Sequence, residues 1–280
     1  YQIKAASGAA DLTGTSVVGT AASGSCRPFA VFSGVPCARV PASCTACDHL
    51  FHQNLPSTSW GTRYFLVPFA GASSYSYRIL GDHPNTALHI NGTGPVHLQA
   101  GQTVDFNGQS GAVLIEGDKP FSVGQFMEGT SCAGNGDPAF LLVNTEDQRI
   151  DDITFATVES DTIDQHYLNI VVRSDATGQV LLNGLPLAPT LFTPFPAHPS
   201  MSYATLTIAP GSHRLQCPAG LTAYVYGIGT WETYVYSAGS RAPMPCGPIV
   251  KRSRRRPLKA ESGVRFSLGS PENHKKCCSP

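Results

Sequence analysis

The sequence has little charge, no long apolar run and no extended helical pattern. Only 14% of its 280 residues are charged, while 41% are hydrophobic, so the chain falls short of the usual quarter of charged residues. Its apolar runs are well below the ~18 residues that cross a bilayer, and we expect no membrane span in this sequence. No window carries the apolar spacing of an amphipathic helix. These absences argue against a membrane protein and against a helical or α/β fold.

Sequence motifs that accompany catalysis are also missing. The chain has no Gly-x-Ser-x-Gly elbow and no His-Glu-x-x-His motif. Carboxylates crowd together at Asp151-Asp152 and in Glu159–Asp164, but such pairs in loops are commonly solvated or form turns. We expect no catalytic residue and no cofactor. The alternative is a secreted carbohydrate-binding or carbohydrate-active domain that uses the acidic stretch Asp151–Asp164.

One pattern of strands and turns occurs twice. Each copy has a strand-like run, an Asn-Gly pair, a second run, a Gly-led turn and an alternating apolar run. The Asn-Gly pairs are Asn91-Gly92 and Asn183-Gly184, and the Gly-led turns follow at Gly101 and Gly211. Asn-Gly between alternating runs predicts a type I′ hairpin. The longer spacing in the second copy predicts an inserted loop rich in proline and aromatic residues.

The predicted fold class is all-β, a duplicated antiparallel β-sandwich of two tandem, packed modules. The strand-like runs are short, β-branched or aromatic, and bounded by turn residues. The expected divisions are an N-terminal extension (1–24), a first module with a Cys-rich loop (25–135), a second module (136–240) and a basic, disordered tail (241–280).

The formal charge of zero conceals a basic C-terminal end. Residues 250–280 hold 9 of the 19 Lys and Arg against 2 acidic residues, whereas the rest has 10 basic and 17 acidic side chains. We interpret the run Lys251–Arg256 as solvated or proteolytically processed. The acidic remainder has no basic groove, so no nucleic-acid partner is expected.

Nine cysteines indicate an oxidising environment. Four of them lie between positions 26 and 47, beside three prolines, as in a loop closed by disulfides. The sequon Asn91-Gly92-Thr93, a candidate glycosylation site on a predicted turn, points the same way. We expect an extracellular protein. The disulfide candidates, whose pairing the sequence leaves open, are Cys26, Cys37, Cys44, Cys47, Cys132, Cys217 and Cys246.

Two metal sites compete with this interpretation. Cys44-x2-Cys47-x-His49-x2-His52 contains zinc ligand types, although a zinc finger separates its two pairs by about a dozen residues. Asp118 and the stretch Glu128–Asp137 offer oxygen ligands for calcium, without the regular spacing of a calcium loop. We expect that no metal binds.

Tyrosines two positions apart are candidate binding residues. Tyr75 with Tyr77, and Tyr224 with Tyr226, each place two rings on one face of a strand. Exposed rings of this kind make good contact residues. The competing interpretation, that these stripes belong to the core, is the commoner case.

Several short segments of the sequence resemble the N-terminal binding domain of the IgG Fc-binding protein family. They include Pro28–Gly34, Cys37, Cys47-Asp-His-Leu50 and Trp60-Gly61, and further similar segments follow as far as Tyr236. The resemblance implies a secreted or cell-surface recognition module that binds a protein or glycoprotein ligand, with immunoglobulin Fc or mucin as the named candidates, and that has no catalytic residues.

Overall fold

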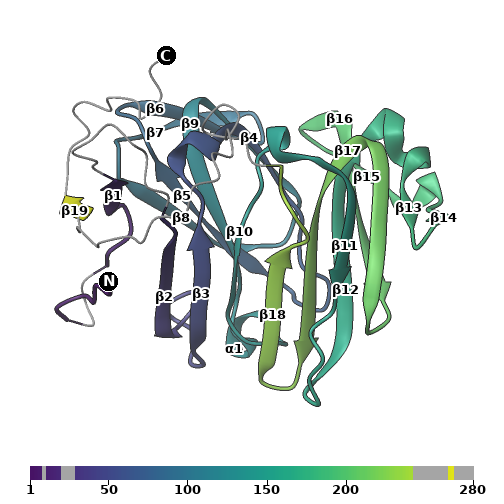
Figure 1. The fold of residues 1–280 in the computed structure, drawn as a ribbon, viewed down its shortest axis with the longest axis horizontal. Coiled ribbons are helices and arrows are strands. Elements are labelled where there is room, and N and C mark those ends of the chain that lie inside the picture. The colour runs from purple at the N-terminus through teal and green to yellow at the C-terminus, as the bar shows by residue number, and fades with distance from the viewer. Residues whose placement is uncertain (8–10, 20–28, 242–263, 268–280) are drawn as a thin grey trace, which may run out of the picture.

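Two curled antiparallel sheets lie side by side in the computed structural model, which describes residues 1–7, 11–19 and 29–241 together with the backbone of 264–267 (Figure 1). The first sheet has the strand order β7-β6-β9-β5-β8, and β4 and β10 also pair with β9. Its strands are β4 (Gly61–Leu66), β5 (Tyr75–Gly81), β6 (Thr86–Ile90), β7 (Thr93–Leu98), β8 (Thr103–Gln109), β9 (Val113–Met127) and β10 (Ala139–Leu142).

The second sheet repeats this arrangement strand for strand. Its order is β14-β13-β17-β12-β16-β15, and β11 and β18 also pair with β17. The strands are β11 (Ile150–Ala156), β12 (Ile163–Arg173), β13 (Leu181–Leu182), β14 (Leu185–Pro186), β15 (Thr193–Phe195), β16 (His198–Ile208), β17 (Ser212–Gly229) and β18 (Glu232–Ser237). Only β15, in the inserted loop, has no counterpart. The predicted all-β, duplicated fold is confirmed.

A long central strand gives each module its two layers. The first part of β9 pairs with β4 and β6, whereas its last part, from Phe121 to Met127, pairs with β5 and β10. β17 does the same with β11 and β13 and then with β12 and β18. Because one strand serves both layers, each sheet curls around its own apolar interior.

The modules are joined along the last part of β17, which is buried on both faces. Along β17, Tyr224 and Tyr226 enter the core of the first module, while Ala223 and Val225 enter that of the second. This follows from the two-residue period of a strand. The hydroxyl of Tyr226 accepts a hydrogen bond from the Ala70 N–H at 2.8 Å, so polar contacts also cross the junction.

A separate two-stranded hairpin precedes the first module. It consists of β2 (Val31–Ala38) and β3 (Asp48–Asn54), and in Figure 1 it lies beside β10. The one α-helix of the described residues is the single turn α1 (Thr130–Ala133). Short 3-10 turns are η1 (Ser57–Ser59), η2 (Glu146–Gln148), η3 (Ser174–Gln179) and η4 (Pro189–Leu191). Among the described residues, no helix is long and apolar enough to cross a membrane.

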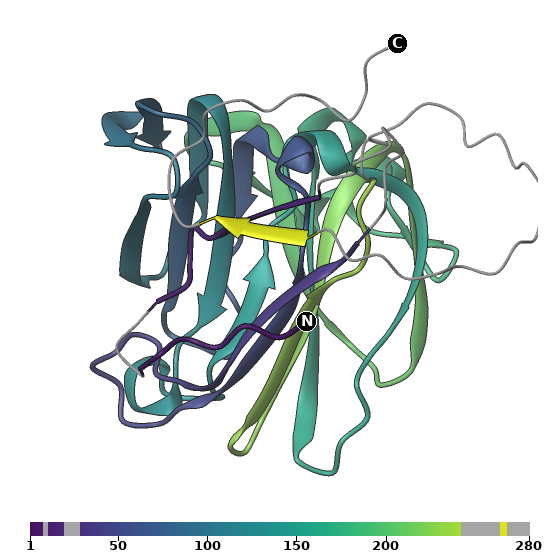
Figure 2. The same ribbon diagram turned by 60° about the vertical axis from the view of Figure 1, so that its left-hand side comes forward.

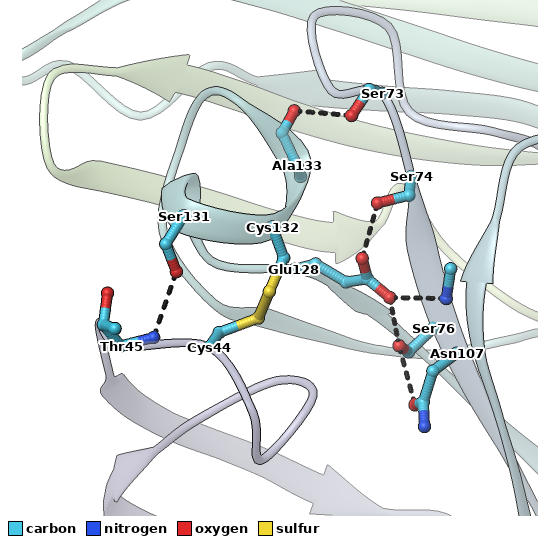
Figure 3. Close-up of a disulfide and its surroundings, with 11 residues drawn as sticks. Cys44, Thr45, Ser73, Ser74, Ser76, Asn107, Glu128, Ser131, Cys132 and Ala133 are labelled. Atoms are coloured by element: carbon cyan, nitrogen blue, oxygen red, sulfur yellow. Dashed lines mark hydrogen bonds between the residues drawn. A yellow bond between two sulfur atoms is a disulfide. The ribbon is translucent and has the colours of Figure 1, made fainter.

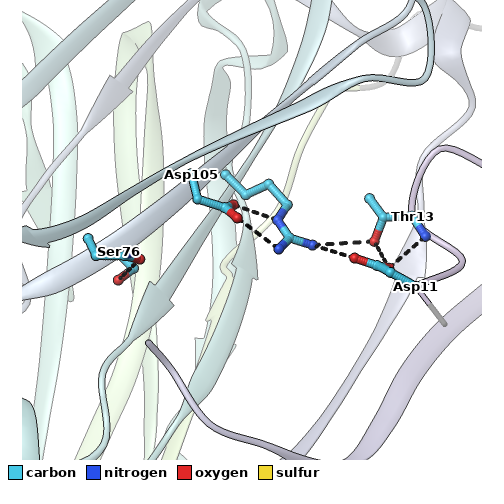
Figure 4. Close-up of polar contacts among 6 residues, drawn as sticks. Asp11, Thr13, Ser76 and Asp105 are labelled. Atoms are coloured by element: carbon cyan, nitrogen blue, oxygen red, sulfur yellow. Dashed lines mark hydrogen bonds and ion pairs between the residues drawn. The ribbon is translucent and has the colours of Figure 1, made fainter. Parts of the chain in front are cut away.

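The N-terminal segment is held to the first module by an arginine. The guanidinium group of Arg78 on β5 binds Asp105 on β8 through two hydrogen bonds of 2.6 and 3.0 Å, and it reaches Asp11 at 3.2 Å on its other side (Figure 4). Further along, β1 (Ser16–Gly19) pairs with β19 (Val264–Ser267).

Two strands pair with a strand that belongs to a different expected division of the chain. Strand β10 falls within the range 136–240, yet it pairs with β9 of the first module. Strand β19 falls within the range 241–280, and Figure 2 shows its backbone beside β1. The rest of that tail, including Lys251–Arg256, lies outside the described residues.

Candidate functional site

The four tyrosines proposed as binding residues are buried in the core. Tyr75, Tyr77, Tyr224 and Tyr226 are each at most 2% exposed and belong to the first hydrophobic cluster. Their strands are covered on the tyrosine face by the neighbouring module or layer. The prediction of a contact surface there is wrong, and the competing interpretation as core is correct.

An exposed aromatic pair lies instead on the hairpin. Phe32 of β2 is 54% exposed and Phe51 of β3 is 67% exposed. Their rings are stacked, with centroids 5.6 Å apart and planes inclined by 6°. We call the side of the hairpin that carries Phe32, Gly34, Phe51 and Gln53 the hairpin face. Large exposed apolar side chains gathered on one face are typical of an interaction site.

Gly34 makes room for the stacked pair. It lies opposite Phe51 in the register of the hairpin, and Phe32 lies opposite Gln53. A Cβ atom at position 34 would come within 3.1 Å of the Phe51 ring. The ring therefore extends across the bare backbone of Gly34 toward Phe32 on the neighbouring strand.

Two disulfides fix the hairpin. Cys37–Cys47 links its two strands at the loop, and Cys44–Cys132 joins that loop to α1. Figure 3 shows the second disulfide and a hydrogen bond that joins the same two segments. The Thr45 N–H donates to the Ser131 hydroxyl at 3.0 Å. The aromatic pair is thus presented on a covalently anchored support, which lowers the ordering cost of binding.

A buried carboxylate supports the helix end of this anchor. Glu128, only 2% exposed, accepts hydrogen bonds from the hydroxyls of Ser74 and Ser76 at 2.5 Å and from the Gly108 N–H at 2.8 Å (Figure 3). All three donors come from the first module. The end of β9 that leads into α1 is therefore joined to β5 and β8 by polar contacts, in addition to the backbone pairing of β9 with β5.

The opposite side of the hairpin packs on the first module. The ring of His52 lies edge-on to Phe140 of β10, with centroids 5.4 Å apart and planes at 86°. Burial lowers the pKa of His52 below its usual 6.5, because a charged ring would lose its hydration there. The hairpin consequently has one packed face and one open face.

Of the remaining predicted cysteines, the structure describes Cys217. Cys217 is fully buried in the second module and unpaired among the described residues, so its selection as a disulfide candidate is wrong. Burial raises the pKa of its thiol, as expected for an inert core cysteine. Cys26 and Cys246 lie outside the described residues.

Neither alternative metal site is formed. Cys44 and Cys47 are oxidised in two different disulfides, which leaves no thiolate for zinc. Within the described part of the chain, no group of three or more His, Cys, Asp or Glu side chains could hold a metal ion. This includes the described carboxylates of the calcium alternative, of which Glu128 is already bound by Ser and backbone donors.

Arginines pair with two carboxylates of the enzymatic alternative. Arg214 makes two hydrogen bonds to Asp152, and Arg241 lies 3.3 Å from Asp151. The Arg214 contact lowers the pKa of Asp152. A glycosidase acid needs a raised pKa instead, so Asp152 lacks that property of an acid.

Asn91 lies where the sequence predicted, in an exposed turn between β6 and β7. Its φ of 50° and that of Gly92, 76°, fit the predicted type I′ geometry. Glycosylation at this turn stays a prediction.

Comparisons with known proteins add the family. A family model described as IgGFc binding protein matches residues 1–227. The chain belongs to the IgGFc-binding protein family. The IgGFc-binding protein of Homo sapiens is 36% identical over 109 residues, which are 38% of this chain and 2% of that protein. No solved structure matches the chain. This member of the IgGFc-binding family therefore corresponds to a small fraction of its curated relative.

Reasoning from the sequence missed Phe32 and Phe51. A local signal for this face was present in the sequence. Phe32 and Gly34, like Phe51 and Gln53, are two positions apart in a strand and therefore lie on one side of it, close to paired cysteines. Tyr75-x-Tyr77 gives the same two-residue signal in a buried strand. What separates the two cases is the number of layers that cover each strand, which local sequence does not encode.

Proposed function

We propose that this chain is an extracellular, non-enzymatic recognition module that binds a protein ligand through the hairpin face. The carrying observation is the stacked, exposed pair Phe32 and Phe51 on a disulfide-anchored hairpin. The first ligand to test is the Fc part of immunoglobulin G, because the curated relative is called IgGFc-binding protein.

Aromatic side chains suit this role for energetic reasons. A Phe ring buries a large apolar area and loses few rotamers on binding, so two adjacent rings can form the centre of an interface. Holding the rings in place beforehand adds affinity, since less freedom is lost when the ligand arrives. The anchored backbone and the stacking of the two rings both work in that direction.

The disulfides support the extracellular location. Cys37–Cys47 and Cys44–Cys132 involve four of the nine cysteines, and disulfides of this kind persist in oxidising compartments. The family supports the same location, and the proposal of a non-enzymatic role agrees with a family described by binding.

The test is binding of the full, oxidised chain to immobilised IgG Fc at low and physiological salt, beside a mucin and a glycan panel. The informative variant is Phe32→Ser with Phe51→Ser. Loss of two aromatic anchors should weaken binding by a factor of about 10 to 100, and the loss should persist at higher salt because the contact is apolar.

Leu185→Gln is the matched control, because it removes the apolar side chain without creating a sequon at Asn183. Leu185 is also a strongly exposed apolar side chain, at 71%, but it lies on β14 at the far end of the second module (Figure 1). It should bind Fc like the unsubstituted chain. If the double variant binds equally well, the hairpin face is not the site; if only mucin or glycan is retained, the ligand proposal is wrong.

A further inference from the structure

The two Asn-Gly turns of the duplicated modules have the same backbone and the same hydrogen bonds. Asn91 and Asn183 have φ values of 50° and 54°, and the glycines that follow have 76° and 79°. The side-chain oxygen of Asn91 accepts from the Leu114 N–H at 2.9 Å, and that of Asn183 accepts from the Arg214 N–H at 3.0 Å. The turns therefore form an internal pair for comparison.

They differ at the side-chain nitrogen. Nδ2 of Asn183 lies 3.0 Å from Nδ1 of His213, whose residue precedes Arg214 on β17. The residue in the equivalent place on β9 is Val113, which offers no acceptor. Nδ2 of Asn91 donates no hydrogen bond among the described residues, so this nitrogen is open to substitution while the side-chain oxygen keeps its structural role.

They also differ in the residue that an N-glycosyltransferase reads. Asn91-Gly92-Thr93 is a sequon, whereas Asn183-Gly184 is followed by Leu185. The first turn has space for a glycan, because Asn91 and Thr93 are exposed and a Cβ atom at Gly92 would meet nothing within 4 Å. A folded chain can thus carry a sugar here without disturbing its core.

We propose that Asn91 carries an N-linked glycan and that its structural counterpart Asn183 does not. The donor is an oligosaccharide on a lipid pyrophosphate. Nδ2 forms a bond to the anomeric carbon and loses one proton, while the bond from that carbon to the pyrophosphate oxygen breaks and the lipid pyrophosphate leaves. No oxidation or reduction is involved. The inference rests on the extracellular location proposed above, since the transfer takes place in the secretory pathway.

The glycan would leave the hairpin face accessible. The turn connects β6 to β7, and β7 is the end strand of the first sheet. In Figure 1 these two strands lie at the upper left, whereas β2 and β3 extend through the lower half. A sugar on the end strand also hinders edge-to-edge association of the sheet, a hazard of unpaired strands.

The experiment is secretion of the full chain from eukaryotic cells behind a leader peptide. Intact mass is measured before and after peptide N-glycosidase treatment in heavy-oxygen water, followed by reduction and mass spectrometry of the tryptic peptides 79–149 and 174–214. Heavy oxygen separates release during the treatment from earlier deamidation of Asn-Gly, and a parallel incubation without the enzyme measures spontaneous deamidation in the same water. The expected result is label at Asn91, no label at Asn183, and both disulfides formed.

Two variants at one position sharpen the result. Thr93→Ala should abolish the glycan while leaving Asn91 and its bond to Leu114 in place, and Thr93→Ser should retain it. A secreted, disulfide-bonded chain with unmodified Asn91 overturns the glycan proposal alone. A chain that stays inside the cell with reduced cysteines overturns the extracellular location, and the glycan with it.

Discussion

The side-chain oxygen of Asn91 accepts a hydrogen bond from the backbone N–H of Leu114, 23 residues along the chain and 2.9 Å away. Leu114 is 2% exposed, so its N–H would otherwise lack a partner. Asn183 satisfies Arg214 in the same way in the second module. Each Asn thus closes a turn and joins that turn to the central strand of its module, which gives the repeated Asn-Gly pair a structural reason.

Replacing Asn91 with Ala should destabilise the chain by about 1–3 kcal/mol, because the hydrogen bond is lost and a left-handed conformation becomes strained. Asn91→Gly should cost less, since Gly adopts a φ of 50° freely. The same order is expected at Asn183. Urea unfolding of protein made without glycosylation measures the effect, and equal losses for Ala and Gly would contradict the strain argument.

A second prediction concerns the buried tyrosines. The Tyr224 hydroxyl accepts from the Asn144 N–H at 3.0 Å, and both residues are buried. Tyr224→Phe should therefore lower the free energy of unfolding by about 1–3 kcal/mol, as an N–H is left without a partner. Tyr77 supplies the matched control, because its buried hydroxyl has no partner among the described residues. Tyr77→Phe should be neutral or slightly stabilising, and a loss equal to that of Tyr224→Phe would contradict this reasoning.

The turns and the fold class could be predicted because their signals are local. Asn183-Gly184 specifies a type I′ turn wherever it stands between strands, and the structure confirms that turn. The equivalence of β4 with β11, or of β10 with β18, carries no repeated residues and appears only in the pairing with β9 and β17. Such pairings link distant segments, so neither the two layers nor the position of β10 could be derived from local patterns.

The candidate site was less predictable for two reasons. The four paired cysteines could form three sets of disulfides. The observed set includes Cys44–Cys132, whose partners are 88 residues apart in the sequence. In addition, alternation shows that Phe32 and Tyr77 each lie on one face of a strand, but not whether that face is covered. Phe32 is 54% exposed and Tyr77 is 1% exposed only because of what packs against them.

The two disulfides should contribute unequally to stability. Loop-closure entropy predicts about 4.6 kcal/mol for a separation of 88 residues and about 2.7 kcal/mol for one of 10. Substituting Cys44 and Cys132 with Ala should thus cost about 2 kcal/mol more than substituting Cys37 and Cys47. Guanidinium unfolding of both double variants tests this. A larger loss from the Cys37 and Cys47 variant would show that strain or native packing outweighs chain entropy.

Acid should weaken the packing of the hairpin through His52. Its pKa in the folded chain is below 6.5 because the ring is buried against Phe140. The unfolded chain therefore takes up a proton first as the pH falls below about 6.5, and unfolding becomes easier. Above that pH the ring is neutral in both states and contributes no pH dependence.

The variant His52→Gln should flatten the dependence of unfolding free energy on pH below about 6.5. A single proton accounts for at most about 1.4 kcal/mol per pH unit, so the difference in slope from the unsubstituted chain should stay below that value.

His166, whose pKa is also lowered by burial, lies on β12 in the second module and is unchanged in this comparison. His166→Gln should remove its own share of the slope and leave that of His52. Urea unfolding at a series of pH values, with both disulfides intact, measures all three curves. Parallel curves for the unsubstituted chain and His52→Gln would show that His52 does not link the hairpin to pH.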